Sequence, residues 1–122
     1  MLNTLKLNYG NNIYISICMV SGNIYKSSDL VTWTGSNHGS SNKLWDITYG
    51  NSKFVSGGAG TIVSSSDGNS WSSTTDSIGF YGIIYGNNIF VAAGQDGKIY
   101  TSVDGTSWTL RTTGITDTLK AV

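Results

Sequence analysis

The stretch Ser102-Val103-Asp104-Gly105-Thr106-Ser107-Trp108 decides the fold, because the chain contains it three times. A second copy occupies residues 65–71, and a degraded first copy, with Leu30 in place of the glycine, occupies residues 27–33. The aspartates (29, 67, 104) and the tryptophans (33, 71, 108) are both separated by 38 and then by 37 residues. A fixed period in this range predicts a repeat architecture.

Each repeat is predicted to contain four short antiparallel strands. In the third and clearest copy, strand-like segments at 80–85, 89–93 and 98–102 are separated by Gly- and Asn-rich turns, and Trp108 opens a fourth strand. This pattern is typical of an antiparallel meander. The expected boundaries are about 3–36, 43–74 and 79–112, with linkers at 34–43, 72–79 and 109–117, and residues 117–122 are expected to be the first strand of a fourth meander because they match residues 3–8.

The composition excludes several classes of protein and partner. The 122 residues indicate one domain, and 7 basic residues balance 7 acidic ones, so no basic face for nucleic acid is expected. The single cysteine, Cys18, cannot form an internal disulfide and is expected to be buried and inert. We identify no signal peptide and no bilayer-spanning stretch, so the expectation is a soluble protein without membrane contacts, cytoplasmic by default. Neither a metal site nor a cofactor is predicted.

The third repeat resembles a known family of repeats. From Tyr85 to Trp108 it reads Tyr-Gly-Asn-x-x-Phe-Val-x-x-Gly-x-x-Gly-x-Ile-x-x-Ser-x-Asp-Gly-x-Ser-Trp. This pattern resembles the Asp-box, or BNR, repeats of sialidase-like β-propellers, and is still more similar to bacterial propellers related to photosystem II stability/assembly factors. The resemblance implies an all-β fold of propeller blades. The box here has one residue fewer between Asp and Trp than the usual sialidase form, so a sialidase function is not implied.

Each box is predicted to be a structural staple on a hairpin. The Asp carboxylate can accept hydrogen bonds from backbone N–H groups of its own turn, Gly allows the unusual backbone angle, and Trp buries a large ring. A single carboxylate per turn is a poor calcium site. The predicted staple residues are Asp29, Trp33, Asp67, Gly68, Trp71, Asp104, Gly105 and Trp108.

Three blades are too few to close a propeller, which typically has about four to eight. An open arc would leave an apolar blade face at each end, and such faces usually mark interfaces. We therefore predict a homodimer that completes a six-bladed ring, in which residues 117–122 of one chain and residues 3–8 of the other compete for one inner-strand position. A larger ring and a fragment of a longer propeller are the alternatives.

A ligand is expected at the face of the arc that carries the linkers between blades. Trp45 and Tyr81 occupy equivalent positions there and could stack on a sugar ring, although packing between blades is the competing interpretation. His38 is expected to be a solvated loop residue. The candidate ligand-binding residues are Asn37, Trp45, Asp46, Tyr81, Gln95, Asp96 and Arg111.

No enzymatic activity is predicted. In the sialidases whose propeller repeats these resemble, the active site uses three Arg and a Tyr–Glu pair. This chain has Arg111 as its only Arg and has no Glu. Glycoside hydrolysis needs a paired acid and base, and no such pair is identified. The predicted function is a non-enzymatic, self-assembling scaffold that binds a ligand, with a glycan or a protein as candidates. The alternatives are a structural or assembly scaffold without a small-molecule ligand and a degenerate glycosidase.

Overall fold

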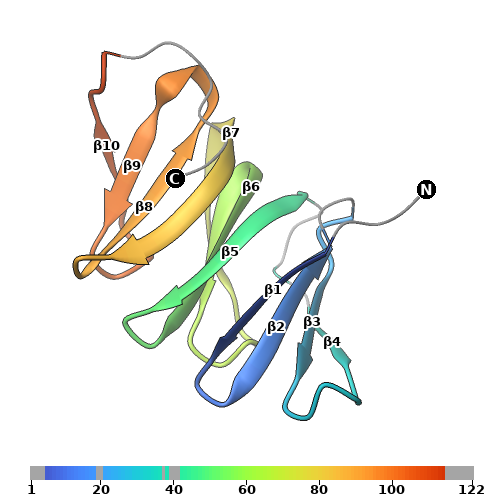
Figure 1. Ribbon diagram of the computed structural model, residues 1–122. Coiled ribbons are helices and arrows are strands. Elements are labelled where there is room, and N and C mark those ends of the chain that lie inside the picture. The colour runs from blue at the N-terminus through green and yellow to red at the C-terminus, as the bar shows by residue number, and fades with distance from the viewer. Residues whose placement is uncertain (1–4, 19–20, 37, 39–41, 115–122) are drawn as a thin grey trace.

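The computed structural model describes residues 5–18, 21–36, 38 and 42–114, and the regular secondary structure of this part of the chain is β-strand apart from one 3-10 turn. A four-stranded sheet contains β1 (Leu5–Gly10), β2 (Ile13–Cys18), β3 (Ile24–Ser27) and β4 (Thr34–Ser36) in that order. A six-stranded sheet contains β5 (Leu44–Gly50), β6 (Lys53–Ser65), β7 (Ser72–Gly86), β8 (Ile89–Gly94), β9 (Ile99–Ser102) and β10 (Thr109–Arg111). All pairings are antiparallel (Figure 1), as the sequence predicts.

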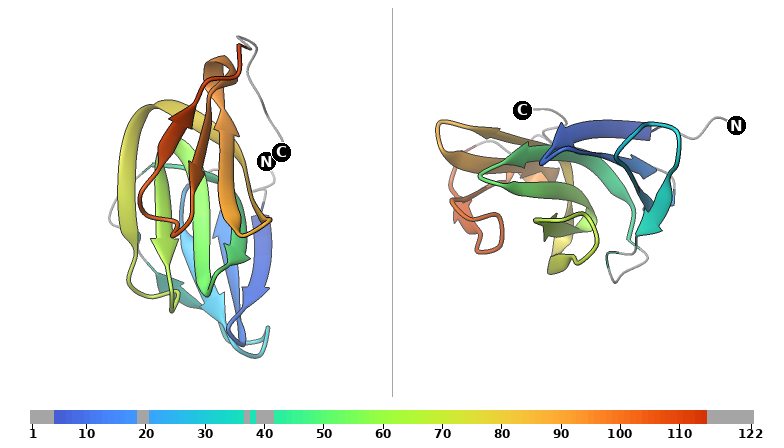
Figure 2. Two further views of the ribbon diagram at one scale, coloured as in Figure 1. Left: turned by 90° about the vertical axis from the view of Figure 1, so that its left-hand side faces the viewer. Right: turned by 90° about the horizontal axis from the view of Figure 1, so that it is seen from below.

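The six-stranded sheet consists of two blades that share strands. Residues 53–58 of β6 pair with β5, and residues 59–64 pair with the start of β7. The end of β7, from residue 80, pairs with β8. Blade 1 is therefore β1 to β4, blade 2 is β5, β6 and the start of β7, and blade 3 is the end of β7 with β8, β9 and β10. Figures 1 and 2 show the three blades side by side, with β5 next to both β1 and β7.

The predicted linker at 72–79 is wrong, because these residues belong to the continuous strand β7. Gly79 pairs with Ala59, and the register of β7 shifts between Phe80 and Gly82. The pairing of β7 with β6 is irregular between Thr75 and Gly79, and β8 becomes the partner from Phe80, so the strand passes from blade 2 to blade 3 without a loop. The 3-10 turn η1 (Gln95–Gly97) joins β8 and β9 in blade 3.

The Gly-Asn marker after each inner strand forms the first hairpin turn of its blade. The two central residues have positive φ in every copy, with values of 49° and 63° at Asn11 and Asn12 and 52° and 62° at Asn87 and Asn88. Two consecutive positive φ angles define the type I′ turn, whose twist matches that of paired strands. Asn tolerates this conformation, which explains why it recurs at this position.

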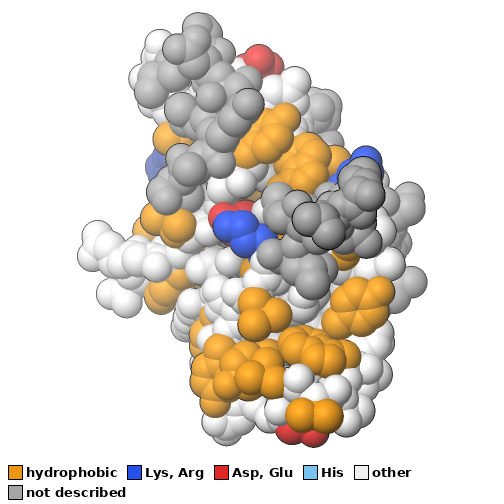
Figure 3. All heavy atoms as spheres, turned by 45° about the vertical axis from the view of Figure 1, so that its right-hand side comes forward, with side chains coloured by type: hydrophobic (Ala, Val, Ile, Leu, Met, Phe, Trp, Pro, Cys, Tyr) orange, Lys and Arg blue, Asp and Glu red, His pale blue; other side chains and the backbone are white. Residues whose placement is uncertain are grey.

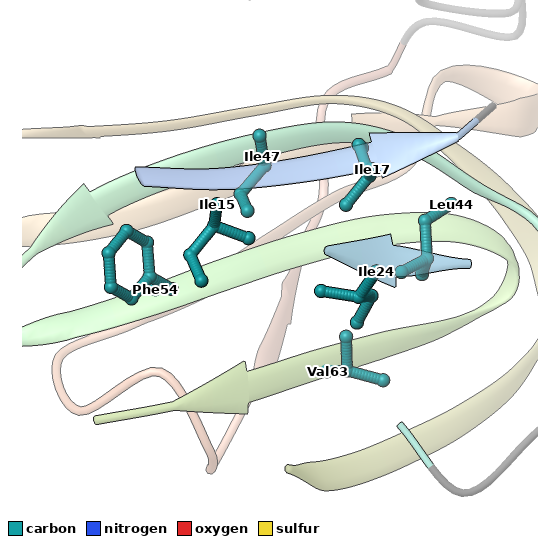
Figure 4. Packing of buried hydrophobic residues seen from close by; sticks show 7 residues of the cluster. All are labelled: Ile15, Ile17, Ile24, Leu44, Ile47, Phe54 and Val63. Carbon is teal, nitrogen blue, oxygen red and sulfur yellow. The ribbon is translucent and has the colours of Figure 1, made fainter. Parts of the chain in front are cut away.

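The hydrophobic core lies between the blades, not within a separate layer. One buried cluster joins blades 1 and 2 and contains Ile15, Ile17, Ile24, Leu44, Ile47, Phe54 and Val63 (Figure 4). A second cluster joins blades 2 and 3 and contains Val55, Ile62, Ile78, Phe80, Ile83, Phe90 and Ala92. Cys18 is buried, as predicted. Each blade is thus stabilised mainly by its neighbour, which is how repeat proteins distribute their stability.

Two predictions lie outside the described residues, namely the extra inner strand at 117–122 and the ligand residue Asn37. Within the described part of the chain, no helix is long and apolar enough to cross a membrane.

Candidate functional site

The three boxes form the same network of hydrogen bonds around one carboxylate oxygen. In the second copy, Asp67 Oδ1 accepts from the backbone N–H of Asn69 at 2.8 Å and of Ser70 at 3.0 Å. These backbone donors, with Ser70 first, lower the pKa of Asp67 to about 2. The pKa values of Asp29 and Asp104 are lowered by the same kind of contact. The geometry therefore assigns the box carboxylates to their own turns.

Each box also contains a buried serine, which the sequence did not predict. The Ser65 hydroxyl donates to Asp67 Oδ1 at 3.0 Å and accepts from the backbone N–H of Gly68 at 2.7 Å. Ser27 and Ser102 make the same pair of contacts in the other two boxes. The available signal was a serine two residues before the aspartate in every copy.

The box tryptophans attach each blade to the one before it. Trp71 packs against the cluster that joins blades 1 and 2, and its indole Nε1–H donates to Ser36 Oγ of blade 1 at 3.0 Å. Trp108 packs against the cluster that joins blades 2 and 3, but its buried Nε1–H has no hydrogen-bond partner among the described residues. Trp33, in blade 1, remains 37% exposed because no blade precedes it in the described chain.

The rings of Trp45 in β5 and Tyr81 in β7 stack face to face. We call the end of the inner strands where they lie the mouth of the arc. Their ring centroids are 4.6 Å apart and their planes differ by 3°. Gly79 lies beneath the pair, since a Cβ added there would be 2.7 Å from Trp45 Cζ3. Gln95 joins this group by accepting the Gly79 N–H at 3.0 Å through Oε1. Each ring therefore covers one face of the other, as expected of packing between blades.

Asp46 connects three inner strands. Its Oδ2 accepts the backbone N–H of Ile83 in β7 at 2.9 Å, and its Oδ1 accepts the N–H of Ile47 at 2.9 Å. The same Oδ1 lies 3.5 Å from the Lys6 ammonium in β1. Both carboxylate oxygens are thus engaged in holding the blades together.

Asp96 and Arg111 form a separate group on blade 3. Both line one surface hollow, together with Gly97, Lys98, Leu110, Thr112, Thr113 and Gly114. Asp96 has a φ of 60° within η1, and Arg111 donates from Nε to Thr101 Oγ1 at 2.9 Å. The structure therefore divides the described candidate residues into a mouth group (Trp45, Tyr81, Gln95), the strand-linking Asp46 and a blade 3 group (Asp96, Arg111).

The expectation that His38 is solvated is wrong. Its side chain is only 4% exposed, and no described residue forms a hydrogen bond with its Nδ1. Burial disfavours the charged imidazolium and lowers the pKa of His38, against the opposing effect of backbone contacts at Gly22 and Asn42. Among the described residues, no group of three His, Cys, Asp or Glu side chains is placed to hold a metal ion.

An apolar surface covers the side of blade 1 that faces away from blade 2. Leu7, Ser16, Tyr25 and Trp33 line a hollow there. Beside it, the rings of Tyr9 and Tyr14 lie 4.6 Å apart. Leu7 and Tyr9 are each 53% exposed. We call this surface the blade 1 outer face, and define it by Leu7, Tyr9, Tyr14, Ser16, Tyr25 and Trp33. Figure 3 shows hydrophobic side chains gathered on this side of the molecule.

Comparisons with known proteins support a β-propeller fold. No family model matches the chain, and no curated protein matches it. Fifteen chains among the solved structures are similar to it. One is YCF48 bound to D1 peptide, which matches with a TM-score of 0.54 and 19% identity over 88% of this chain. The match covers 37% of that longer chain, so this chain is similar in fold to a part of a β-propeller protein.

Proposed function

We propose that this chain is a non-enzymatic β-propeller scaffold that associates with itself through the ends of its arc of blades. The observation that carries the proposal is the blade 1 outer face. Exposed contiguous apolar surface is rare on monomeric proteins and usually marks an interface. A scaffold of this kind works by presenting surfaces, which agrees with the structural roles of the box carboxylates and of Asp46.

The repeat itself indicates what the blade 1 outer face is suited to contact. Tyr49, Phe54 and Trp71 of blade 2 occupy the positions of Tyr9, Tyr14 and Trp33 in blade 1. In blade 2 these side chains pack against the preceding blade, in the cluster that includes Ile15 and Ile24. The blade 1 outer face is therefore the same kind of surface without a neighbour in the described chain.

Solution mass tests self-association. We expect light scattering at micromolar concentration to give twice the 13.0 kDa of one chain. Changing Tyr25 and Trp33 together to Ser should return the mass to that of one chain, because it removes apolar area from the blade 1 outer face. Leu110→Ser is the matched control, since Leu110 is 50% exposed on another part of the surface. A wild-type mass of one chain over this range would contradict the proposal.

The scaffold is proposed to take a polypeptide ligand at the mouth group, with Asp96 and Arg111 of the separate blade 3 group as a second contact point that carries both charges. The solved structure of YCF48, which has a similar fold, is bound to a peptide and supports this choice. A carbohydrate, the other candidate, would need an open aromatic face, and the stacking of Trp45 on Tyr81 leaves each ring with one face fewer.

Paired arrays distinguish these ligands. Labelled protein is applied to a peptide array and to a glycan array, with Trp45→Ala as the matched variant. We expect peptide signals that fall roughly tenfold in Trp45→Ala, because stacking contacts of this size contribute on the order of 1 kcal/mol or more. Glycan signals above background that depend on Trp45 would contradict the polypeptide proposal and indicate a carbohydrate ligand.

A further inference from the structure

One glycine in each blade lies where the next blade would contact it, so its surroundings differ according to whether that blade is present. Gly10, Gly50 and Gly86 end the inner strands of blades 1, 2 and 3. A Cβ added at Gly10 would lie 2.3 Å from Cγ of Tyr49, and one at Gly50 would lie 2.1 Å from Cγ of Tyr85. In both cases the tyrosine ring of the next blade rests directly on the glycine. At Gly86 an added Cβ would meet no described residue within 4 Å.

The ring that matches this open position is present at the other end of the chain. Tyr9, Tyr49 and Tyr85 are equivalent, each preceding the glycine of its own blade. Tyr49 and Tyr85 are partly buried against the two interblade clusters, whereas Tyr9 is 53% exposed. Within the described chain, Gly86 has no tyrosine ring resting on it, and the Tyr9 ring rests on no glycine.

Polar contacts follow the same order from blade to blade. Asn11 Nδ2 donates to the backbone oxygen of Ser66 in the next box at 3.5 Å, and Asn51 Nδ2 donates to that of Val103 at 3.2 Å. The third asparagine of this series is Asn87, in the turn beside Gly86. The carbonyl equivalent to Ser66 and Val103 in blade 1 belongs to Ser28.

We propose that Tyr9 of one copy of this chain seats on Gly86 of a second copy, with Asn87 of that second copy donating to the Ser28 carbonyl of the first. The inference rests on the proposed self-association and names its geometry. Two such contacts, related by a two-fold axis, close two chains into one ring of six blades. The occupant is a second copy because the closing contact continues an interface that the chain already forms twice within itself.

Gly86→Ala tests this contact, because we expect it to weaken the interface between chains without affecting the fold of one chain. Within one chain the new methyl group meets none of the described residues, and the φ of Gly86 is outside the left-handed region, so we expect the monomer to fold normally. In the dimer each of the two methyl groups would overlap the Tyr9 ring of the other chain. We expect the dissociation constant, measured by sedimentation, to rise by roughly 100-fold or more. Gly35→Ala is the control, since Gly35 is equally open and its equivalent in blade 2, Ser73, stays exposed.

A double-mutant cycle links the effect to the tyrosine. Tyr9→Ala should also weaken the dimer, and adding Gly86→Ala to it should raise the dissociation constant by less than about threefold, because the overlapping ring is gone. Tyr9→Phe keeps the ring and should dimerise like the wild type. Additive effects of Tyr9→Ala and Gly86→Ala would overturn the assignment.

A cross-link gives a second, independent measurement. Tyr9→Cys and Gly86→Cys proteins, prepared separately and mixed under oxidising conditions, should form a disulfide-linked heterodimer, whereas neither should cross-link strongly alone. A wild-type dimer in which Gly86→Ala has no effect and no cross-link forms would overturn the inference and leave self-association intact. A wild-type monomer would instead contradict the proposed function itself.

Discussion

Ser65 supports the turn of the second box from a buried position. Its buried hydroxyl accepts the N–H of Gly68 at 2.7 Å and supports the carboxylate of Asp67. We expect Ser65→Ala to lower the free energy of unfolding by about 1–3 kcal/mol, because the Gly68 N–H loses its partner in a buried position. Urea denaturation measures this change. Ser66→Ala, which alters an exposed neighbour, should have little effect, and equal losses in both variants would contradict the assignment.

The box carboxylates also set the response of stability to acid. Because the pKa of Asp67 is lowered to about 2 in the folded protein, the unfolded state binds more protons below the ordinary value of 3.8. The stabilisation is therefore complete above that value and is lost as the pH falls towards 2. Asp29 and Asp104 act in the same direction. Urea midpoints measured from pH 5 to about pH 2 should decrease in the wild type.

Asp67→Asn isolates the contribution of one box. The amide retains an oxygen acceptor for the N–H groups of Asn69 and Ser70 but cannot titrate. We expect a shallower decrease in the urea midpoint with acid than in the wild type, with the fold retained at pH 7. An unchanged slope would show that Asp67 does not contribute to the acid response.

At the scale of elements, the contact between neighbouring blades restricts substitution at the glycines that end the inner strands. Gly50→Ala would place a methyl group against the Tyr85 ring within one chain. We expect a loss of about 1–3 kcal/mol in the free energy of unfolding, the usual cost of overfilling a packed contact. Thermal denaturation of Gly50→Ala beside Gly35→Ala measures it, and Gly35→Ala should melt like the wild type. Identical melting of the two variants would contradict this view of the interface.

The sequence allowed the blades to be predicted because turn chemistry is local. Asn11-Asn12 and the Asp67-Gly68 turn need particular backbone angles, and few residues accept them. The continuity of β7 could not be predicted, because it depends on the pairing of Gly79 with Ala59, which is 20 residues away in the chain. Residues 72–77 have the polar composition of a loop, but residues 72–75 pair with β6.

At the scale of the whole molecule, the candidate site was only partly predictable. The repeat period placed Trp45 and Tyr81 at equivalent positions, and the structure brings them into contact. The period gave no signal for the role of Asp46, because blade 3 has Gly82 at that position and blade 1 has Lys6. The burial of His38 was equally hidden, since a Gly-, Ser- and Asn-rich segment predicts solvent exposure.

The path of β7 has a consequence for how the protein opens. One continuous strand supplies the outer edge of blade 2 and the inner strand of blade 3, so the hydrogen bonds of both blades depend on the same strand. In hydrogen exchange, we expect the amides of 72–75 and 80–86 to share one free energy of opening and one dependence on denaturant. Mass spectrometry of peptides from these two segments tests this, and distinct opening energies would show two independent units. Blades 2 and 3 are thus expected to be a single unit of cooperativity, although the repeat counts them as two.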